Sequence, residues 1–400
     1  MTNRRGTVFA LTLGNFITGS VVLAPAGMLQ ELAHHFNIGL GAAGVVMSLG
    51  AVVLCISSPL MTALTSGVDR RTLLMVTILL VSVGQVLAAM SPSWGFLLAT
   101  RAAMMAAAAV FTPQAASTIS LVVEPRERPA AIATAFLGWS MALALGVPLI
   151  SLLASSFGWR QAYLALGVLG FVSSAILAVG VPRGLVGARV SFDSWKMIAT
   201  SRVFLAILLV TVLSGSGQFV VYAYIKPLLA ALTSATVWRV TVDLTVFGVM
   251  SIIGNVLASR MVTRLGVFVT CVISLLAILA GMLVLYAGEG VPWAVTAGLV
   301  VWGLGFASSN SMQQARLAAE APSLTAASIA LNTSSIYIGQ AIGASVSGAM
   351  VGHGLLTRIT VVALAFMVLA VATAFVSERL RPGPGEPRRR TKPLNVPASP

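Results

Sequence analysis

The sequence predicts an all-α membrane protein in which twelve transmembrane helices form two similar six-helix halves. Three observations lead to this fold class. Only 8% of the 400 residues are charged and 58% are hydrophobic, whereas soluble domains carry about 25% charged residues. Apolar runs of about 20 residues, the length that crosses the hydrocarbon core of a bilayer, recur along the whole chain. One polar break near the middle divides these runs into six and six.

The twelve apolar runs follow one another at short intervals. A transmembrane β-barrel would instead show alternating segments of about ten residues. The first run follows Arg4 and Arg5 and ends in Ala24-Pro25-Ala26, as a signal peptide would, but its length and the eleven runs behind it favour a retained span. In order, the predicted spans are 7–28, 41–66, 72–90, 95–121, 131–152, 161–181, 203–225, 241–259, 266–286, 293–314, 325–350 and 357–377.

The basic residues indicate how the chain crosses the membrane, because cytoplasmic loops carry an excess of Lys and Arg. If both termini are cytoplasmic, all but five of the 24 Lys and Arg residues fall on the inner side. We therefore expect a multi-pass protein of the inner (plasma) membrane with both termini in the cytoplasm. The five exceptions are Arg101, Arg160, Lys226, Arg239 and Arg358.

Similar short motifs also recur in the two halves at a constant sequence separation. Glu124-Pro125 ends the fourth span and Ala321-Pro322 ends the tenth, while Gly146 and Gly343 occupy corresponding places in the fifth and eleventh. Such a repeat is typical of transporters whose site lies between the halves. The predicted organisation is a first bundle over 1–181, a cytoplasmic loop over 182–202, a second bundle over 203–377 and a disordered basic cytoplasmic tail over 378–400.

Several function classes do not fit this chain. The formal charge of +14 reflects few, unevenly placed charges, which argues against a nucleic-acid partner. We see no Walker-type loop and no Ser/His/Asp or Cys/His grouping on one membrane face, so neither an enzyme nor a cofactor is expected. No metal site is expected from His34, His35 and His353, and Cys55 and Cys271 are interpreted as apolar fillers.

Short motifs occur in a specific order. Asp69-Arg70-Arg71 follows the second span, Arg101 lies in the fourth, Gly146-Val147-Pro148 lies in the fifth, and Phe157-Gly158-Trp159-Arg160 opens the sixth. In this order the motifs resemble those of the major facilitator superfamily, in its twelve-span efflux branch of drug:proton antiporters and arabinose-efflux-like proteins. The second half adds Phe219 to Pro227, Phe247-Gly248, Gly254-Asn255, Arg264-Leu265-Gly266, Trp302-Gly303, Gln314 to Leu317 and Ala330 to Ala341.

The resemblance implies the major facilitator fold and a secondary active transporter. Two bundles would rock about a central cavity lined by spans 1, 4, 7 and 10, and the partners would be a small-molecule solute and the lipid bilayer. It also implies export and a monomer. The chain departs from the family pattern at Ser66 and Asp69, where the family has Asp and Gly, and at Met104-Met105, which replace Gln-Gly.

Polar side chains inside spans are costly and usually functional. We expect Arg101 to act in the solute pathway or its lining, because it lies on the order of 9 Å from the outer end of its span. For Lys226, anchoring at the membrane interface and substrate contact both stay open. The predicted pathway residues are Asn15, Arg101, Gln114, Gln218, Tyr222, Lys226, Asn332, Tyr337 and Gln340.

A second set is predicted to control the change between conformations. Pro148 removes one backbone hydrogen bond and permits a kink, and the charged loop at Asp69 would hold one state by pairing with a neighbouring helix end. The alternatives are that the glycines only pack and that the loop charges only set topology. The set comprises Asp69, Arg70, Arg71, Gly146, Pro148 and Arg264.

None of the ten acidic residues falls in the middle of a predicted span, and Glu31 and Asp243 lie at outer ends. Related antiporters often carry an acid in span one, near Ser20 to Val22 here. Because a buried carboxylate is the usual proton carrier, its absence argues against proton coupling. A cationic drug would also find no counter-charge, and with Arg101 as the only clear charge inside a span, a neutral or weakly anionic solute fits better, such as a drug-like compound, a sugar or a nucleoside. Protons stay open as the coupling ion. The alternative functions are an importer of the same fold and a transporter-like sensor or scaffold without turnover.

Overall fold

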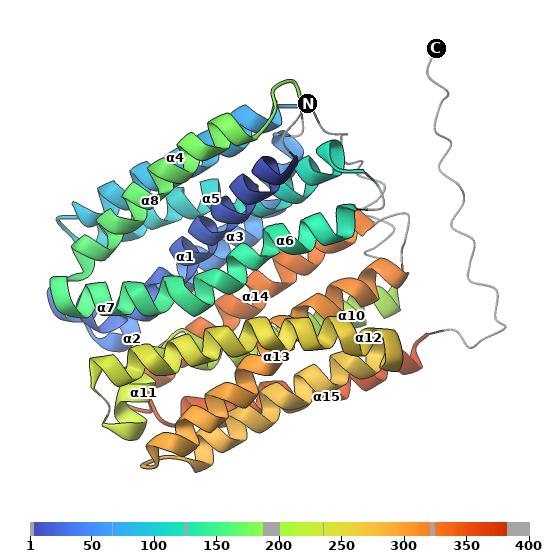
Figure 1. Cartoon of the computed structure of the whole chain (residues 1–400). Coiled ribbons are helices and arrows are strands. Elements are labelled where there is room, and N and C mark those ends of the chain that lie inside the picture. The colour runs from blue at the N-terminus through green and yellow to red at the C-terminus, as the bar shows by residue number, and fades with distance from the viewer. Residues whose placement is uncertain are drawn as a thin grey trace.

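The computed structural model describes residues 4–65, 67–124, 127–186, 201–234, 236–320 and 325–381. All regular structure in these ranges is helical, and the helices form two bundles side by side (Figure 1). Residues 187–200 of the predicted central loop and 382–400 of the predicted tail lie outside the described residues, so these two domain boundaries stay predictions.

The first bundle contains six spanning units, of which two are interrupted. The second unit bends at Gly44, between a one-turn helix and a long one, and the fifth contains a short π-helical segment. The units are α1 (Arg4–His35), α2 (Leu40–Ala43) with α3 (Val45–Leu64), α4 (Arg70–Ala89), α5 (Trp94–Val122), α6 (Arg128–Met141) with η1 (Ala142–Gly146) and α7 (Val147–Phe157), and α8 (Trp159–Gly180).

The second bundle has the same number of spans. Its second and third spans run together as one helix of 51 residues, broken at Gly266, where φ is 77° and ψ is 167°. Glycine adopts positive φ at no steric cost, so it marks the turn between two spans, and the predicted twelve-helix fold is confirmed. The elements are α10 (Arg202–Tyr222) with α11 (Ile225–Thr233), α12 (Val237–Ala287), α13 (Pro292–Glu320), α14 (Thr325–Gly352) and α15 (Ile359–Arg379).

Several helices begin at a polar cap. The side chains of Asp69, Ser93, Ser201 and Thr236 each accept a hydrogen bond from a backbone N–H in the first turn of the helix that follows. A cap of this kind satisfies one of the free N–H groups at a helix start. Polar residues in the short turns thus define where apolar spans begin.

The two bundles pack alike and meet along two seams. α1 packs against α6 and α8, and α10 packs correspondingly against α14 and α15. Between the bundles, α3 packs against α14, while α12 packs against α6, η1 and α7. At the second seam Gly248 approaches the backbone of Ala144 so closely that a side chain at 248 would overlap it. Small residues permit such close helix contact in membranes.

The outer faces of the bundles are apolar. Phe9, Ile56, Val179 and other large apolar side chains are exposed on them, as expected for surfaces that face lipid. Nine described helices are long and apolar enough to cross a membrane, with α12 counted once. α13 and α14 are not among these nine, and both carry many Ser, Asn or Gln residues. Both of these helices belong to the second bundle.

The positions of the first and last helix ends distinguish the two ends of the molecule. α1 begins and α15 ends at one end, which we call the terminus side (Figure 1). α2, α7 and α11 lie at the opposite end, which we call the far side (Figure 1). If the termini are cytoplasmic, as the basic residues predict, the terminus side faces the cytoplasm.

Candidate functional site

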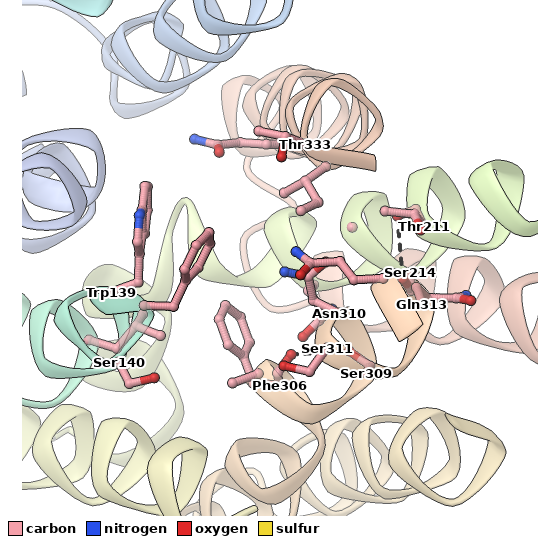
Figure 2. A pocket seen from close by; sticks show the side chains of 18 of the residues that line it. Trp139, Ser140, Thr211, Ser214, Phe306, Ser309, Asn310, Ser311, Gln313 and Thr333 are labelled. Atoms are coloured by element: carbon pink, nitrogen blue, oxygen red, sulfur yellow. Dashed lines mark hydrogen bonds between the residues drawn. The ribbon is translucent and has the colours of Figure 1, made fainter. Parts of the chain in front are cut away.

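A cavity of about 190 Å³ lies between the two bundles. The first bundle contributes six lining residues and the second contributes seventeen, so the cavity is asymmetric. Figure 2 shows Trp139 and Ser140 on one wall, with Asn310 and Ser311 across from them. The lining residues are Leu23, Thr112, Phe136, Trp139, Ser140, Leu143, Thr211, Ser214, Gly215, Gln218, Phe219, Asn255, Phe306, Ala307, Ser309, Asn310, Ser311, Gln313, Gln314, Thr333, Ile336, Tyr337 and Gln340.

The chemistry of the wall is polar but uncharged. No Asp, Glu, Lys, Arg or His is among the described residues that line the cavity. The first bundle supplies mainly apolar and aromatic groups, such as Leu23, Phe136 and Leu143, whereas the second supplies most of the carboxamides and hydroxyls. A charged solute would find no opposite charge in this lining, but a neutral solute with both apolar and hydrogen-bonding groups would find partners for both.

Hydrogen bonds hold the aromatic wall in place. The indole Nε1 of Trp139 donates to Thr112 Oγ1 (3.1 Å), and Thr112 Oγ1 donates to Asn15 Oδ1 (2.9 Å). Asn15 Nδ2 in turn donates to the backbone oxygen of Ala135 (3.0 Å). This relay joins α1, α5 and α6, and Asn15 itself is fully buried behind the wall. The relay fixes the orientation of the Trp139 ring.

A similar relay occupies the corresponding place in the second bundle. Thr211 Oγ1 donates to Asn332 Oδ1 (2.8 Å), and Asn332 Nδ2 donates to Asn310 Oδ1 (2.8 Å). It joins α10, α13 and α14, which correspond to α1, α5 and α6. Asn332 occupies the position equivalent to Ala135 under the offset that relates Gly146 to Gly343. Asn332, like Asn15, is buried behind the cavity and orients a lining residue.

Three other predicted pathway residues line the cavity itself. They are Gln218, Tyr337 and Gln340. The Oε1 atom of Gln218 is buried and has no hydrogen-bond partner among the described residues. Because Gln218 also lines the cavity, a solute donor that reaches this atom would supply the missing hydrogen bond.

Two predicted pathway residues lie elsewhere. Tyr222 is buried in an aromatic cluster, with its ring centroid 5.8 Å from those of both Phe247 and Phe306. Gln114 donates from Nε2 to Thr65 Oγ1 (3.3 Å) and so joins α5 to the end of α3. Neither residue is among the described lining residues.

Arg101 binds backbone oxygens of α1 and α3. Its Nη1 and Nη2 atoms donate to the carbonyl oxygens of Val21 and Val22 (both 2.7 Å), and its Nε donates to that of Val46 (3.4 Å). Pro25 has no N–H, so the Val21 carbonyl four residues earlier lacks its usual helical donor. Arg101 supplies that donor. It is 1% exposed and is not among the described residues that line the cavity, and a role in solute passage stays a prediction.

Lys226 joins the two bundles on the far side. Its Nζ forms an ion pair with Glu31 of α1 and donates to Ser155 Oγ (2.8 Å) and to the backbone oxygen of Gly27 (3.2 Å). Nearby, Tyr224 Oη of the second bundle donates to the backbone oxygen of Gly41 in the first (3.0 Å). These contacts form what we call the far-side seal. Both predictions made for Lys226 stay untested.

Asp69 joins the loop before α4 to the segment after α8. Its carboxylate accepts hydrogen bonds from the backbone N–H groups of Thr72 (3.0 Å), Gly184 (2.6 Å) and Leu185 (3.1 Å). Desolvation by itself would raise the pKa of Asp69, but these hydrogen bonds outweigh it and lower the pKa below its usual value. Thr72 belongs to the first bundle, and Gly184 and Leu185 belong to the segment that follows it.

The other predicted gating residues lie at three places: the start of α4, the break in α12 and the fifth span. Arg70 is buried, whereas Arg71 is partly exposed and Arg264 is exposed near the break in α12. Gly146 ends the π-helical segment η1, and Pro148 follows it. A proline in a helix disturbs the preceding turn, which accounts for the irregular backbone at the seam where α12 packs on this span.

Several lining residues that were not predicted as pathway residues lie in a polar run of α13. α13 contains Ser308-Ser309-Asn310-Ser311-Met312-Gln313-Gln314, in which six of seven residues are polar. Such a run inside a predicted span marks a helix that does not face lipid on that turn. Five of these residues line the cavity, and the run alone would have indicated them.

Comparison with known proteins gives consistent matches. The sequence profile of the Major Facilitator Superfamily matches residues 9–344. The chain is 31% identical over 381 residues to the inner membrane transport protein YdhP of Escherichia coli (strain K12), covering 94% of this chain and 96% of that one. A probable sugar efflux transporter of Mannheimia succiniciproducens is 22% identical and covers 86% and 87% of the two chains.

Solved structures show the same fold. A bacterial homologue of the human lysosomal transporter Spinster, in an inward-facing and occupied conformation, aligns with a TM-score of 0.72 at 16% identity, over 94% of this chain and 96% of that one. A point mutant of the nucleoside transporter NupG aligns with a TM-score of 0.72 at 15% identity, over 94% of this chain and all of that one.

Proposed function

Because the chain belongs to the major facilitator superfamily, we propose that it is a secondary transporter that exports a small neutral or weakly anionic solute by alternating access. The solute would bind in the cavity between the bundles. The bundles would then rock so that the cavity opens to one side of the membrane at a time.

The observation that carries the proposal is an uncharged polar cavity between two pseudo-symmetric bundles. The lining comes from both bundles, so a bound solute touches both of the bodies that move. On the far side, Lys226 and Tyr224 of the second bundle bind Glu31 and Gly41 of the first. Bundles that are joined on one side support a resting transporter whose site is directed toward the other side.

Export is proposed from the relatives and from the topology. Several relatives are named as probable sugar efflux transporters, and the excess of Lys and Arg supports cytoplasmic termini in the plasma membrane. With that orientation, the far-side seal faces outward and the resting cavity faces the cytoplasm, where an exporter collects its solute.

Counterflow in proteoliposomes tests the function directly. Vesicles containing the purified protein are loaded with an unlabelled solute, and uptake of the labelled form is followed. We expect transient accumulation for at least one neutral solute, and none in vesicles with Gly248→Trp, which would block the seam between the bundles. Absence of counterflow for every neutral and weakly anionic solute in the panel would contradict the proposal and favour a sensor or scaffold.

The direction requires a separate measurement. Accumulation of the same solute in cells that overproduce the protein is compared with a deletion strain. An exporter lowers the internal concentration, whereas an importer of the same fold raises it. Repeating the flux measurement in vesicles with an imposed pH gradient then tests protons as the coupling ion: a gradient that changes flux supports coupling, and a flux independent of it excludes coupling.

A further inference from the structure

The uncharged cavity contains two features that the general transport cycle does not require. One is the buried, unpartnered oxygen of Gln218 on the second bundle, and the other is the oriented indole of Trp139 on the first. Both residues line the same cavity. Together they indicate which chemical groups a bound solute should carry.

Gln218 offers an acceptor that no protein group uses. The residue is 6% exposed, and its Oε1 atom has no partner among the described residues. A buried acceptor is costly unless a donor reaches it. Gln340, on the neighbouring helix α14, is 2% exposed and lines the same cavity. The second bundle thus presents carboxamides that are set up for solute O–H or N–H groups.

Trp139 offers a different kind of surface. Its only donor, Nε1–H, is already engaged by Thr112 Oγ1, and Thr112 is engaged by Asn15. The indole therefore has no hydrogen bond left to give, and what it presents to the cavity is its ring. An aromatic ring held in one orientation is suited to contact the apolar C–H face of a flat solute ring.

The two walls together favour one class of solute. An aliphatic or aromatic ring without hydroxyls would satisfy Trp139 and leave Gln218 unpaired. A charged solute would find no counter-charge in the described lining. An uncharged ring that carries hydroxyls, with C–H groups on its face and O–H groups at its edge, satisfies both walls.

We propose, on the basis of the proposed transport function, that the cavity binds an uncharged hydroxylated ring, with Trp139 against the ring face and Gln218 accepting from a solute hydroxyl. Saccharides and nucleosides share this chemistry. The solute then bridges the two bundles, because Trp139 belongs to the first and Gln218 to the second. Gln218 is a specificity-determining residue in this site, and Thr112 and Asn15 are positioning residues that act through Trp139.

Equilibrium binding to the full chain in nanodiscs tests the site without relying on transport. The radiolabelled probes are lactose, uridine and coumarin, the last being an uncharged ring without hydroxyls. We expect lactose or uridine to bind and coumarin to bind more weakly or not at all. Binding of lactose alone identifies the saccharide class, and binding of uridine alone identifies the nucleoside class.

Matched variants assign the binding to this site. Gln218→Leu removes the acceptor, and we expect affinity for the hydroxylated probe to fall about tenfold, as for the loss of one good hydrogen bond. Gln85→Leu is the control, since Gln85 is also buried with both carboxamide atoms unpartnered but lies outside the described lining. Trp139→Leu should lower affinity, whereas Trp159→Phe, at a buried tryptophan outside the lining, should change it less than about twofold.

Other outcomes separate this proposal from the transport function. Tighter binding of coumarin than of lactose and uridine, binding of none of the three, or unchanged affinity in Gln218→Leu overturns the hydroxylated-ring site, even if counterflow of another solute is observed. Binding that follows the predicted pattern without any counterflow retains the site and overturns the transport cycle. Each variant is checked for intact thermal unfolding before its affinity is compared.

Discussion

Lys226 and Glu31 form an ion pair that ties the second bundle to the first on the far side of the molecule. The two residues are 195 positions apart in the chain, and their side chains are 5% and 20% exposed. Ser155 and the Gly27 carbonyl complete the shell of acceptors around the Lys226 ammonium group. Any movement that opens the far side must separate these groups.

The first prediction concerns this ion pair. Lys226→Met leaves the Glu31 carboxylate without its partner, and Glu31→Gln leaves the ammonium group without its own. Each single change should destabilise the far-side-closed state by about 1–3 kcal/mol, because a partly buried charge loses its partner. In the double variant, the stability of the far-side-closed state should be closer to that of the wild type than in either single variant.

Distances between spin labels on the far side measure this prediction. The labels are placed on exposed positions of α3 and α12, at Val45 and Trp238. Single variants should populate longer distances than the wild type, and the double variant should do so less. Identical distance distributions in all four proteins would show that the pair does not hold the seal.

The second prediction concerns Arg101 and Pro25. If Arg101 supplies the donor that Pro25 cannot, Arg101→Gln should lower stability by several kcal/mol, since three carbonyl contacts are lost from a buried site. Arg101→Lys should recover little, because an ammonium group lacks the forked geometry of guanidinium.

A double-mutant cycle isolates the Val21 carbonyl. Pro25→Ala restores a backbone N–H that can donate to Val21 within α1. In the Pro25→Ala background, Arg101→Gln should therefore cost less than in the wild type, as measured by thermal unfolding. Equal costs in the two backgrounds would show that the Val21 bond contributes nothing specific.

The third prediction concerns the seam between α12 and the fifth span. A side chain at position 248 would overlap the backbone of Ala144, so even Gly248→Ala should push the bundles apart and slow transport. Gly95→Ala is the control, because nothing lies within 4 Å of a Cβ at that position. Transport rates in proteoliposomes check both variants, and wild-type flux in Gly248→Ala would contradict the close packing.

The fourth prediction concerns Asp69 and pH. The pKa of Asp69 is lower in the folded protein than in the unfolded chain. The carboxylate therefore contributes its full share of folding stability above the pKa of the unfolded chain, about 3.9, and this share is lost as the pH falls through the pKa of the folded protein. Asp69→Ala should cost about 1 kcal/mol at neutral pH, as for a lost helix cap, and less as the pH falls below about 4. Thermal unfolding of both proteins from neutral pH down to about pH 3 tests this, and a difference that does not shrink on acidification would contradict it.

The sequence predicted the fold well because hydropathy determines where a chain can cross a bilayer. The twelve spans are confirmed, including the turn at Gly266, which separates two spans inside one continuous helix. Span ends are set by local caps such as Asp69, and local signals are visible in a single sequence.

The site was predicted less completely, because its contacts join residues far apart in the chain. Gln218 and Gln340 were identified as polar groups in spans, and both line the cavity. Asn15 and Asn332 were identified on the same ground, but they lie one layer behind the wall and orient Trp139 and Asn310. Polarity alone does not tell a lining residue from one that supports it.

Arg101 and Lys226 illustrate the same limit for charges. Their partners include backbone oxygens at Val21 and Gly27, and backbone atoms carry no sequence signature. Only the missing N–H of Pro25 hinted that a carbonyl in the first span needed an external donor. A charged residue inside a span thus indicates a free-energy cost of burial that the fold must offset, but it does not indicate which groups are its partners.

Counterflow in proteoliposomes with wild-type protein, Gln218→Leu and Gln85→Leu tests the central claim most directly, because it asks whether the uncharged cavity carries the solute. The account predicts counterflow of an uncharged hydroxylated solute by the wild type and by Gln85→Leu, and a rate reduced about tenfold in Gln218→Leu at subsaturating solute. Equal rates in all three proteins, or flux restricted to charged solutes, would contradict it.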